Sequence, residues 1–96
     1  MKYRVIVLPG AKSEFIEIHR YLKNRFGKSS ASRFKIAYGK LLKTLKQTPR
    51  IYGAIPEREG VRKCAALAPT IVLYEVFEQE KRVEILTLYD GRVDQE

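Results

Sequence analysis

The spacing of apolar residues in the first third of the chain predicts one strand followed by one helix. Residues from Tyr3 to Leu8 are rich in β-branched side chains and alternate weakly, which indicates a strand that Pro9-Gly10 ends. After Ala11, apolar residues recur three and four positions apart, as they do on one face of a helix: Phe15, Ile18, Leu22 and Phe26. Gly27 follows them, where we expect a left-handed C-terminal cap.

A second helix is predicted directly after the first. Ser29-Ser30 offers an N-cap, and apolar residues then continue at helical spacing until Pro49 stops the helix: Phe34, Ala37 or Tyr38, Leu41 and Leu45. Because only two or three residues join the two helices, we expect them to fold back on each other as an antiparallel hairpin.

The second half of the chain predicts strands. Arg50 to Gly60 reads as a loop, and Val61–Leu67 is a plausible strand. The clearest strands are Thr70–Glu78 and Arg82–Tyr89, which a short polar segment joins as a hairpin; both are apolar on both faces, as central strands are. The order β-α-α-β-β-β predicts an α+β fold: an antiparallel-rich four-stranded sheet with an N-terminal strand and a packed α-helical hairpin.

Length and composition favour one globular domain over residues 1–96. Hydrophobic residues make up 45% of the chain, which excludes a disordered protein. Cys64 is the single cysteine, so no internal disulfide is expected, and a reducing cytoplasm is the expected location. No apolar run approaches the roughly 18 residues of a membrane span, and Pro9-Gly10 interrupts the N-terminal apolar run too early for a signal peptide.

The net charge of +8 is concentrated in the first half of the chain. Residues 1–50 hold 13 Lys and Arg against Glu14 and Glu17, a balance of +11, whereas residues 51–96 have a balance of −3. The basic side chains of the predicted helices lie off the apolar stripes, so they cover the outside of the hairpin. This favours an anionic partner, either nucleic acid, an acidic protein segment or a lipid surface; the alternative is a solvated face that keeps the chain soluble.

The sequence contains none of the motifs of common enzymes. A glycine-rich phosphate loop, HExxH, CxxC and GxSxG are all absent, and we expect neither a cofactor nor a metal. His19 is expected at the surface or its boundary, and Cys64 in the core or at its boundary.

A set of charged and phenolic residues at strand positions remains as candidate chemistry: Arg62, Lys63, Tyr74, Tyr89, Asp90 and Arg92. On one face of a sheet, arginines can clamp a phosphate and a tyrosine can stack on a base or exchange a proton. Tyr74 lies among apolar neighbours and is expected in the core. For Arg62 and Arg92, function and plain surface remain open.

Two segments of the chain carry a family pattern: GVRKCAALAPTIVLYEVFEQEKRVEILTLYDGR and the upstream PGAKSEFIEIHRYLKNRFG…ASRFKIAYGKLLKTLKQTPRIYG. The first resembles the C-terminal half of the RelE/ParE superfamily of bacterial toxins, and the second resembles its first part. The resemblance covers residues 3 to about 94. It places Arg62 at the family's basic residue of the second strand and Arg92 at the arginine after the last strand.

The resemblance implies a toxin of a type II toxin–antitoxin system, with roles in growth inhibition and plasmid stabilization. A cognate antitoxin would neutralise it by wrapping an acidic, partly disordered segment around the toxin. The basic outside of the helical hairpin suits such a partner on independent grounds. We therefore expect Lys40, Lys43 and Lys46 to bind the antitoxin.

The chain departs from the ribonuclease members of the superfamily at three positions. Those members carry an arginine where this chain has Ile71, a second basic residue near Cys64, and in several branches a histidine where it has Asp90. The loss of two cations would cost several kcal/mol of transition-state stabilisation in RNA cleavage.

These departures favour the ParE-like branch, whose members inhibit DNA gyrase without being nucleases. Two alternatives remain open. One is a RelE-like endoribonuclease that cuts mRNA on the ribosome with Arg62, Tyr89 and Arg92 as its catalytic residues. The other is a non-toxic orphan binding module. The sequence leaves the oligomeric state open.

Overall fold

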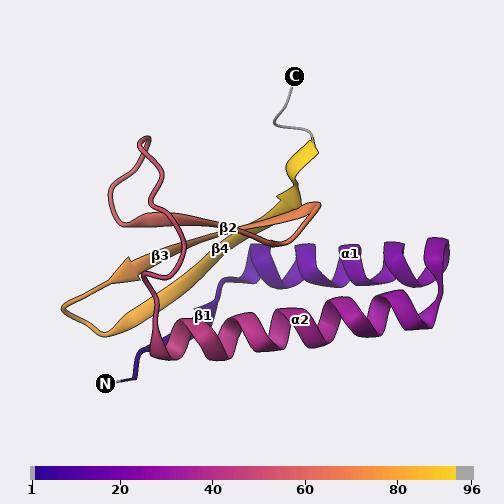
Figure 1. The fold of residues 1–96 in the computed structure, drawn as a ribbon, viewed down its shortest axis with the longest axis horizontal. Coiled ribbons are helices and arrows are strands. Elements are labelled where there is room, and N and C mark those ends of the chain that lie inside the picture. Colours follow the sequence, from indigo (N-terminus) through magenta and orange to yellow (C-terminus); the bar gives the residue numbers. More distant parts are fainter. Residues whose placement is uncertain (1, 93–96) are drawn as a thin grey trace.

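The computed structural model describes residues 2–92 and contains the six predicted elements in the predicted order. Strand β1 (Arg4–Val7) leads into the helices α1 (Pro9–Phe26) and α2 (Lys28–Gln47), and the strands β2 (Val61–Leu67), β3 (Thr70–Phe77) and β4 (Arg82–Asp90) follow. The two helices lie side by side and cover one face of a four-stranded sheet (Figure 1). The predicted α+β fold is therefore confirmed.

The sheet is mixed, in the strand order β1-β4-β3-β2. Strands β2, β3 and β4 form the predicted antiparallel meander. Strand β1 pairs in parallel with β4, with Arg4 opposite Arg82 and Val7 opposite Ile85. The two strands that are apolar on both faces, β3 and β4, are central, as their composition predicts.

The core lies between the sheet and the helices. From the sheet it takes the buried side chains of alternate residues, and from α2 those on its apolar stripe: Val72, Tyr74, Val76, Val83, Ile85, Leu88, Phe34, Tyr38, Leu41 and Leu45. In α1 Ala11 alone is fully buried, and the Phe15 ring stacks on Phe34 and Tyr38 at centroid distances of 5.4 Å and 4.6 Å. The helices are thus joined to each other by aromatic stacking.

The connection between the helices differs from the prediction. Helix α2 begins at Lys28, so Ser29 and Ser30 lie inside its first turn, and the predicted serine N-cap is wrong. Gly27 alone is both the C-cap of α1 and the N-cap of α2, with φ 99° and ψ 171°, so its conformation is not the expected left-handed helical one. A positive φ of this kind suits glycine, and it reverses the chain within one residue.

Strand β4 continues beyond the end of β1, and a side chain from α1 takes the place of the missing strand. The last β1–β4 hydrogen bond is donated by the Leu8 amide to the Ile85 carbonyl. Beyond it, Oε1 of Glu14 accepts hydrogen bonds from the Thr87 hydroxyl at 2.8 Å and the Leu88 amide at 3.0 Å. Glu14 therefore satisfies and protects an otherwise open strand edge.

Candidate functional site

The helical hairpin carries ten Lys and Arg residues, and within residues 2–92 none of them forms an ion pair. They are Lys12, Arg20, Lys23, Arg25, Lys28, Arg33, Lys35, Lys40, Lys43 and Lys46. Lys40, Lys43 and Lys46 are exposed, and their spacing of three sets them along one side of α2. The positive charge of the hairpin is therefore available to a partner.

An apolar groove with a basic rim runs along the hairpin. Two cavities of about 260 and 320 Å³ share Phe15 and Ile16, and Val7 and the ring of Tyr38 extend the apolar lining. Four cations, together with His19, line the same two cavities: Lys12, Arg20, Lys23 and Lys35. An apolar groove with a rim of this charge fits an amphipathic acidic segment.

Two aromatic residues of this groove have notable surroundings. The Tyr38 hydroxyl is buried and has no hydrogen-bond partner among residues 2–92, and burial raises its pKa. His19 is partly buried and stacks on the Phe15 ring at 5.9 Å, which confirms its expected place at the boundary of the surface.

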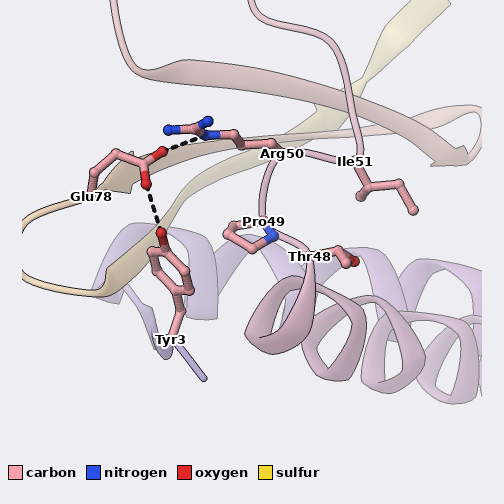
Figure 2. A pocket seen from close by; sticks show the side chains of 6 residues that line it. All are labelled: Tyr3, Thr48, Pro49, Arg50, Ile51 and Glu78. Atoms are coloured by element: carbon pink, nitrogen blue, oxygen red, sulfur yellow. Dashed lines mark hydrogen bonds and ion pairs between the residues drawn. The ribbon is translucent and has the colours of Figure 1, made fainter. Parts of the chain in front are cut away.

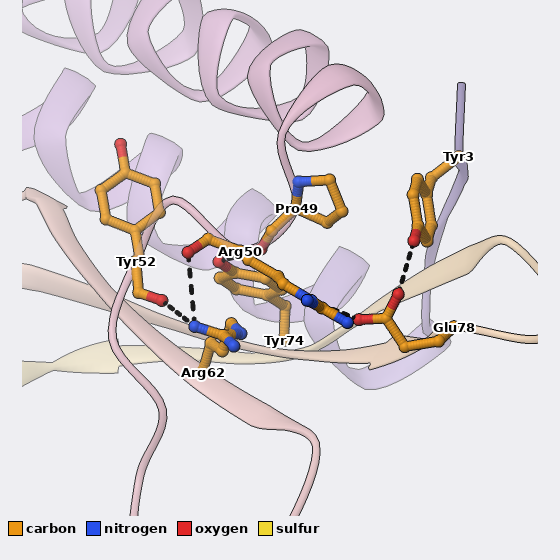
Figure 3. Close-up of polar contacts among 7 residues, drawn as sticks. All are labelled: Tyr3, Pro49, Arg50, Tyr52, Arg62, Tyr74 and Glu78. Carbon is orange, nitrogen blue, oxygen red and sulfur yellow. Dashed lines mark hydrogen bonds and ion pairs between the residues drawn. The ribbon is translucent and has the colours of Figure 1, made fainter. Parts of the chain in front are cut away.

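Arg62 and Tyr74 fasten the segment that follows α2 to the sheet. They lie opposite each other in the β2–β3 register and so share the face that the helices cover. The Tyr74 hydroxyl donates to the Pro49 carbonyl at 2.7 Å, and Nη1 of Arg62 donates to the carbonyls of Arg50 at 3.3 Å and Tyr52 at 2.6 Å (Figure 3). Burial raises the pKa of Tyr74 to about 12, which keeps its hydroxyl protonated as a donor. Tyr74 is fully buried, as predicted.

A second cluster joins Tyr3 and Arg50 to Glu78, which follows β3 at the turn into β4. The Tyr3 hydroxyl donates to Oε1 of Glu78, and Nε of Arg50 donates to Oε2, both at 2.6 Å. These bonds lower the pKa of Glu78, and the bond to Glu78 raises the pKa of Tyr3. The three residues line an open recess of about 570 Å³ together with Thr48, Pro49 and Ile51 (Figure 2).

Arg92 is paired with its near neighbour Asp90. The carboxylate of Asp90 accepts from the backbone amide of Arg92 at 2.9 Å, from Nε at 3.0 Å and from Nη2 at 2.7 Å. These side-chain and backbone hydrogen bonds lower the pKa of Asp90 to about 2. The pair lines a cavity of about 360 Å³ between the helices and the β2–β3 turn, which Tyr21 and Arg33 also line.

The structure does not bring Arg62, Tyr89 and Arg92 together on one surface. Arg62 shares the helix-covered face with Tyr74, whereas Tyr89 pairs with Ile71, which is three residues from Tyr74 on β3 and thus on the opposite face. Arg92 lies beyond the end of β4.

Two of the three positions that depart from the ribonuclease pattern, Cys64 and Ile71, are buried. Cys64 is fully buried, as predicted, and Ile71 is buried against Gly91, where an added Cβ atom would lie 2.7 Å from Cγ1 of Ile71. Lys63 pairs with Leu73, so it is on the other face from Arg62. Within residues 2–92 no three His, Cys, Asp or Glu side chains are grouped as metal ligands, and no helix is long and apolar enough to cross a membrane.

The sequence singled out Arg62, Tyr74, Asp90 and Arg92. It did not reveal the cluster of Tyr3, Arg50 and Glu78, nor the carbonyl groups that Arg62 and Tyr74 bind. Arg50 and Glu78 are 28 positions apart and Tyr3 and Glu78 are 75 apart, and no motif links them. Arg50 and Tyr52 contact Arg62 through backbone carbonyls, which every residue type carries.

Residues 5–94 match the family model of the ParE toxin of the type II toxin–antitoxin system parDE. This chain belongs to the ParE toxin family. The resemblance to the RelE/ParE superfamily that its motifs suggested is thereby confirmed. No curated protein matches this family member by sequence.

Solved structures of both ParE and RelE systems share the fold of this ParE family member. The chromosomal ParDE system of P. aeruginosa gives a TM-score of 0.75 at 19% identity, covering 93% of this chain and 96% of that one. The RelBE2 complex of Mycobacterium tuberculosis gives 0.69 at 17%, covering 94% and 99%. A mutant of the E. coli toxin RelE in the free state gives 0.68 at 15%, covering 99% and 90%. At these identities the similarity is one of fold.

Proposed function

We propose that this toxin arrests bacterial growth in the cytoplasm by binding DNA gyrase, and that it does so without being a nuclease. The observation that carries the proposal is the arrangement of its cations. Arg62 is engaged with the backbone of its own chain, Arg92 is paired with Asp90, and Tyr89 lies on the opposite face from Arg62. RNA cleavage needs several groups converging on one phosphate, and Arg62, Tyr89 and Arg92 do not converge in the described part of the chain.

The proposed partner in the cell is an acidic, partly disordered antitoxin segment that lies on the helical hairpin. The apolar lining of the groove at Phe15 and Ile16 suits the apolar side of such a segment, and the unpaired cations around it suit its carboxylates. Lys40, Lys43 and Lys46 extend the same positive potential toward the C-terminal end of α2. A disordered segment would order on binding, as amphipathic segments do in grooves.

One observation favours a second candidate function, cleavage of mRNA on the ribosome. The fold is nearly as similar to RelE toxins as to a ParE toxin. In that case Arg62, Tyr89 and Arg92 would have to act in a reduced catalytic set, which requires Arg62 to leave the carbonyls of Arg50 and Tyr52.

The test is expression of the chain alone in bacteria, followed by assays of the purified protein. We expect growth arrest with DNA-damage signalling, inhibition of supercoiling by purified gyrase, and intact mRNA on ribosomes. The Arg92→Ala variant separates the two candidates. Cleavage of mRNA at ribosomal A-site codons by the wild type, abolished in Arg92→Ala, would replace the gyrase proposal with the ribonuclease. Normal growth with verified soluble expression would favour the non-toxic orphan module.

A further inference from the structure

The segment between α2 and β2 is irregular, yet three backbone carbonyls within four residues of it accept hydrogen bonds from side chains of the sheet. The Pro49 carbonyl accepts a hydrogen bond from Tyr74, and the carbonyls of Arg50 and Tyr52 accept hydrogen bonds from Arg62 (Figure 3). Fixing a residue's backbone costs about 1–2 kcal/mol of conformational free energy. Here that cost is met during folding, so a partner that binds this segment does not have to order it.

This segment exposes an apolar and a charged side chain, Ile51 and Arg50, of the kinds found in binding surfaces. Ile51 has an exposed fraction of 56%. Arg50 is oriented by Glu78 through Nε alone, and within residues 2–92 its two terminal nitrogens have no partner (Figure 2). Two terminal N–H groups in a fixed plane are the geometry that binds a carboxylate in bidentate fashion.

The charge around the recess is positive. Of the residues from 2 to 92, Glu78 is the single carboxylate that lines it, and its two oxygens already accept hydrogen bonds from Tyr3 and Arg50. The Lys81 ammonium lies 5.3 Å from the centre of the Tyr3 ring and adds a further cation. The recess therefore complements a partner that is acidic next to an apolar site.

We propose that this Ile51 surface, made of Tyr3, Thr48, Pro49, Arg50, Ile51 and Glu78, is where the toxin binds its protein target. The occupant is a folded protein that presents a carboxylate to Arg50 and an apolar depression to Ile51. The inference rests on the proposed function, because it assigns the surface to the target of that function. Arginine and tyrosine around one apolar contact are the residue types that dominate the energy of protein interfaces.

The Ile51 surface is separate from the groove on the hairpin. The residues that line the two do not overlap. The two regions approach each other at Lys46, because its carbonyl accepts a hydrogen bond from the Tyr3 amide at 2.8 Å. Substitutions at Ile51 and Arg50 therefore test target binding, and substitutions along the hairpin test antitoxin binding.

The test compares matched pairs of variants. Ile51→Asp is paired with Ile36→Asp, because Ile36 is exposed to the same extent, 58%, but lies on α2. Arg50→Gln is paired with Arg25→Gln, which removes one arginine charge near the hairpin tip. The probe is purified DNA gyrase, and the readouts are calorimetric affinity and inhibition of supercoiling. We expect Ile51→Asp to weaken binding about tenfold and Arg50→Gln about fivefold, and both control variants to stay within twofold.

Thermal unfolding of each variant verifies that the fold is retained, since exposed substitutions change stability little. If gyrase binds the wild type and Ile51→Asp equally, within twofold, the inference is wrong. If gyrase does not bind the wild type, the proposed function fails, and growth arrest then decides the inference. Arrest that Ile51→Asp relieves and Ile36→Asp retains supports the surface for another protein target. Equal arrest by both variants, or no arrest by the wild type, overturns it.

Discussion

The cations of the helical hairpin and the arginines that follow α2 are used in opposite ways. On the hairpin, ten Lys and Arg residues have no ion pair within the described residues. After α2, four arginines each contact a carboxylate: Arg50, Arg58, Arg82 and Arg92. Arg62 instead binds backbone carbonyls. The arginines of the sheet side therefore hold the chain's own segments in place, and the lysines and arginines of the hairpin remain available to other molecules.

The difference concerns orientation more than stability. Exposed ion pairs typically contribute about 0–1 kcal/mol, so the pairs of Arg50 and Arg92 are weak fasteners. What they do is fix where a guanidinium points. Arg82 shows the same use, because it is held both by Glu84 at 3.0 Å and over the Phe77 ring at 4.2 Å. The stronger internal contacts of this half are instead the buried bond of Tyr74 to the Pro49 carbonyl and the part-buried bond of Arg62 to the Tyr52 carbonyl.

The largest effect is expected from Arg62→Leu. It leaves the Arg50 and Tyr52 carbonyls without their donor, and we expect a loss of about 2–3 kcal/mol in the free energy of unfolding, because bonds to charged groups are the stronger ones. Urea unfolding followed by circular dichroism measures it. Lys63→Leu, one residue away on the other face, is the matched control and should change stability by less than about 0.5 kcal/mol. Equal losses would mean that Arg62 is a surface cation like Lys63.

A smaller effect is expected from Tyr74→Phe, which removes the hydrogen bond to the Pro49 carbonyl. We expect a loss of about 1–2 kcal/mol. Tyr38→Phe is the control in the helical half. That hydroxyl is buried without a partner in the described structure, so its removal should be neutral or stabilising. The same unfolding measurement decides both. A costly Tyr38→Phe together with a neutral Tyr74→Phe would reverse the assignment of which hydroxyl stabilises the fold.

The smallest effect on the fold, and the clearest on binding, is expected from reversing Lys40, Lys43 and Lys46 to Glu. Stability should be nearly unchanged, whereas association with the antitoxin should slow about fivefold at low ionic strength. The difference should shrink at physiological salt, where exposed charges are screened over about 8 Å. Stopped-flow association at two salt concentrations measures it. Reversal of Lys63 and Lys81 on the sheet side is the control, and an equal slowing there would place the antitoxin off the hairpin.

The sequence predicts the fold well because the local spacing of apolar residues indicates each helix and strand. The stripes of the two helices and the doubly apolar β3 and β4 identify both the elements and the central strands. Two features of the fold have no such signal. The one-residue turn at Gly27 looks, in sequence, like a cap followed by a serine N-cap. The use of Glu14 on β4 depends on a contact between residues 74 positions apart.

The candidate site is predicted less well, for a physical reason. Residue type indicates what Arg62 can bind, a group with oxygen acceptors, but not which one it meets. The sequence suggested a phosphate, and the structure supplies the backbone of residues 50 and 52. The Ile51 surface has no signal in sequence. Ile51 and Arg50 lie in a loop, and what distinguishes this loop is that Arg62 and Tyr74 bind its backbone carbonyls.

The parallel pairing of β1 with β4 has a consequence for the order in which parts of the fold can form. Arg4 lies beside Arg82 and Val7 beside Ile85, so β1 is synthesised long before β4, the strand with which it pairs. Closing such a long loop is slow, and a non-local strand pair forms late in folding. While the chain is being synthesised, the hairpin can form from local contacts, but β1 has nothing to pair with until β4 exists. The molecule therefore acquires its helical half early and its finished sheet only after β4 has been synthesised.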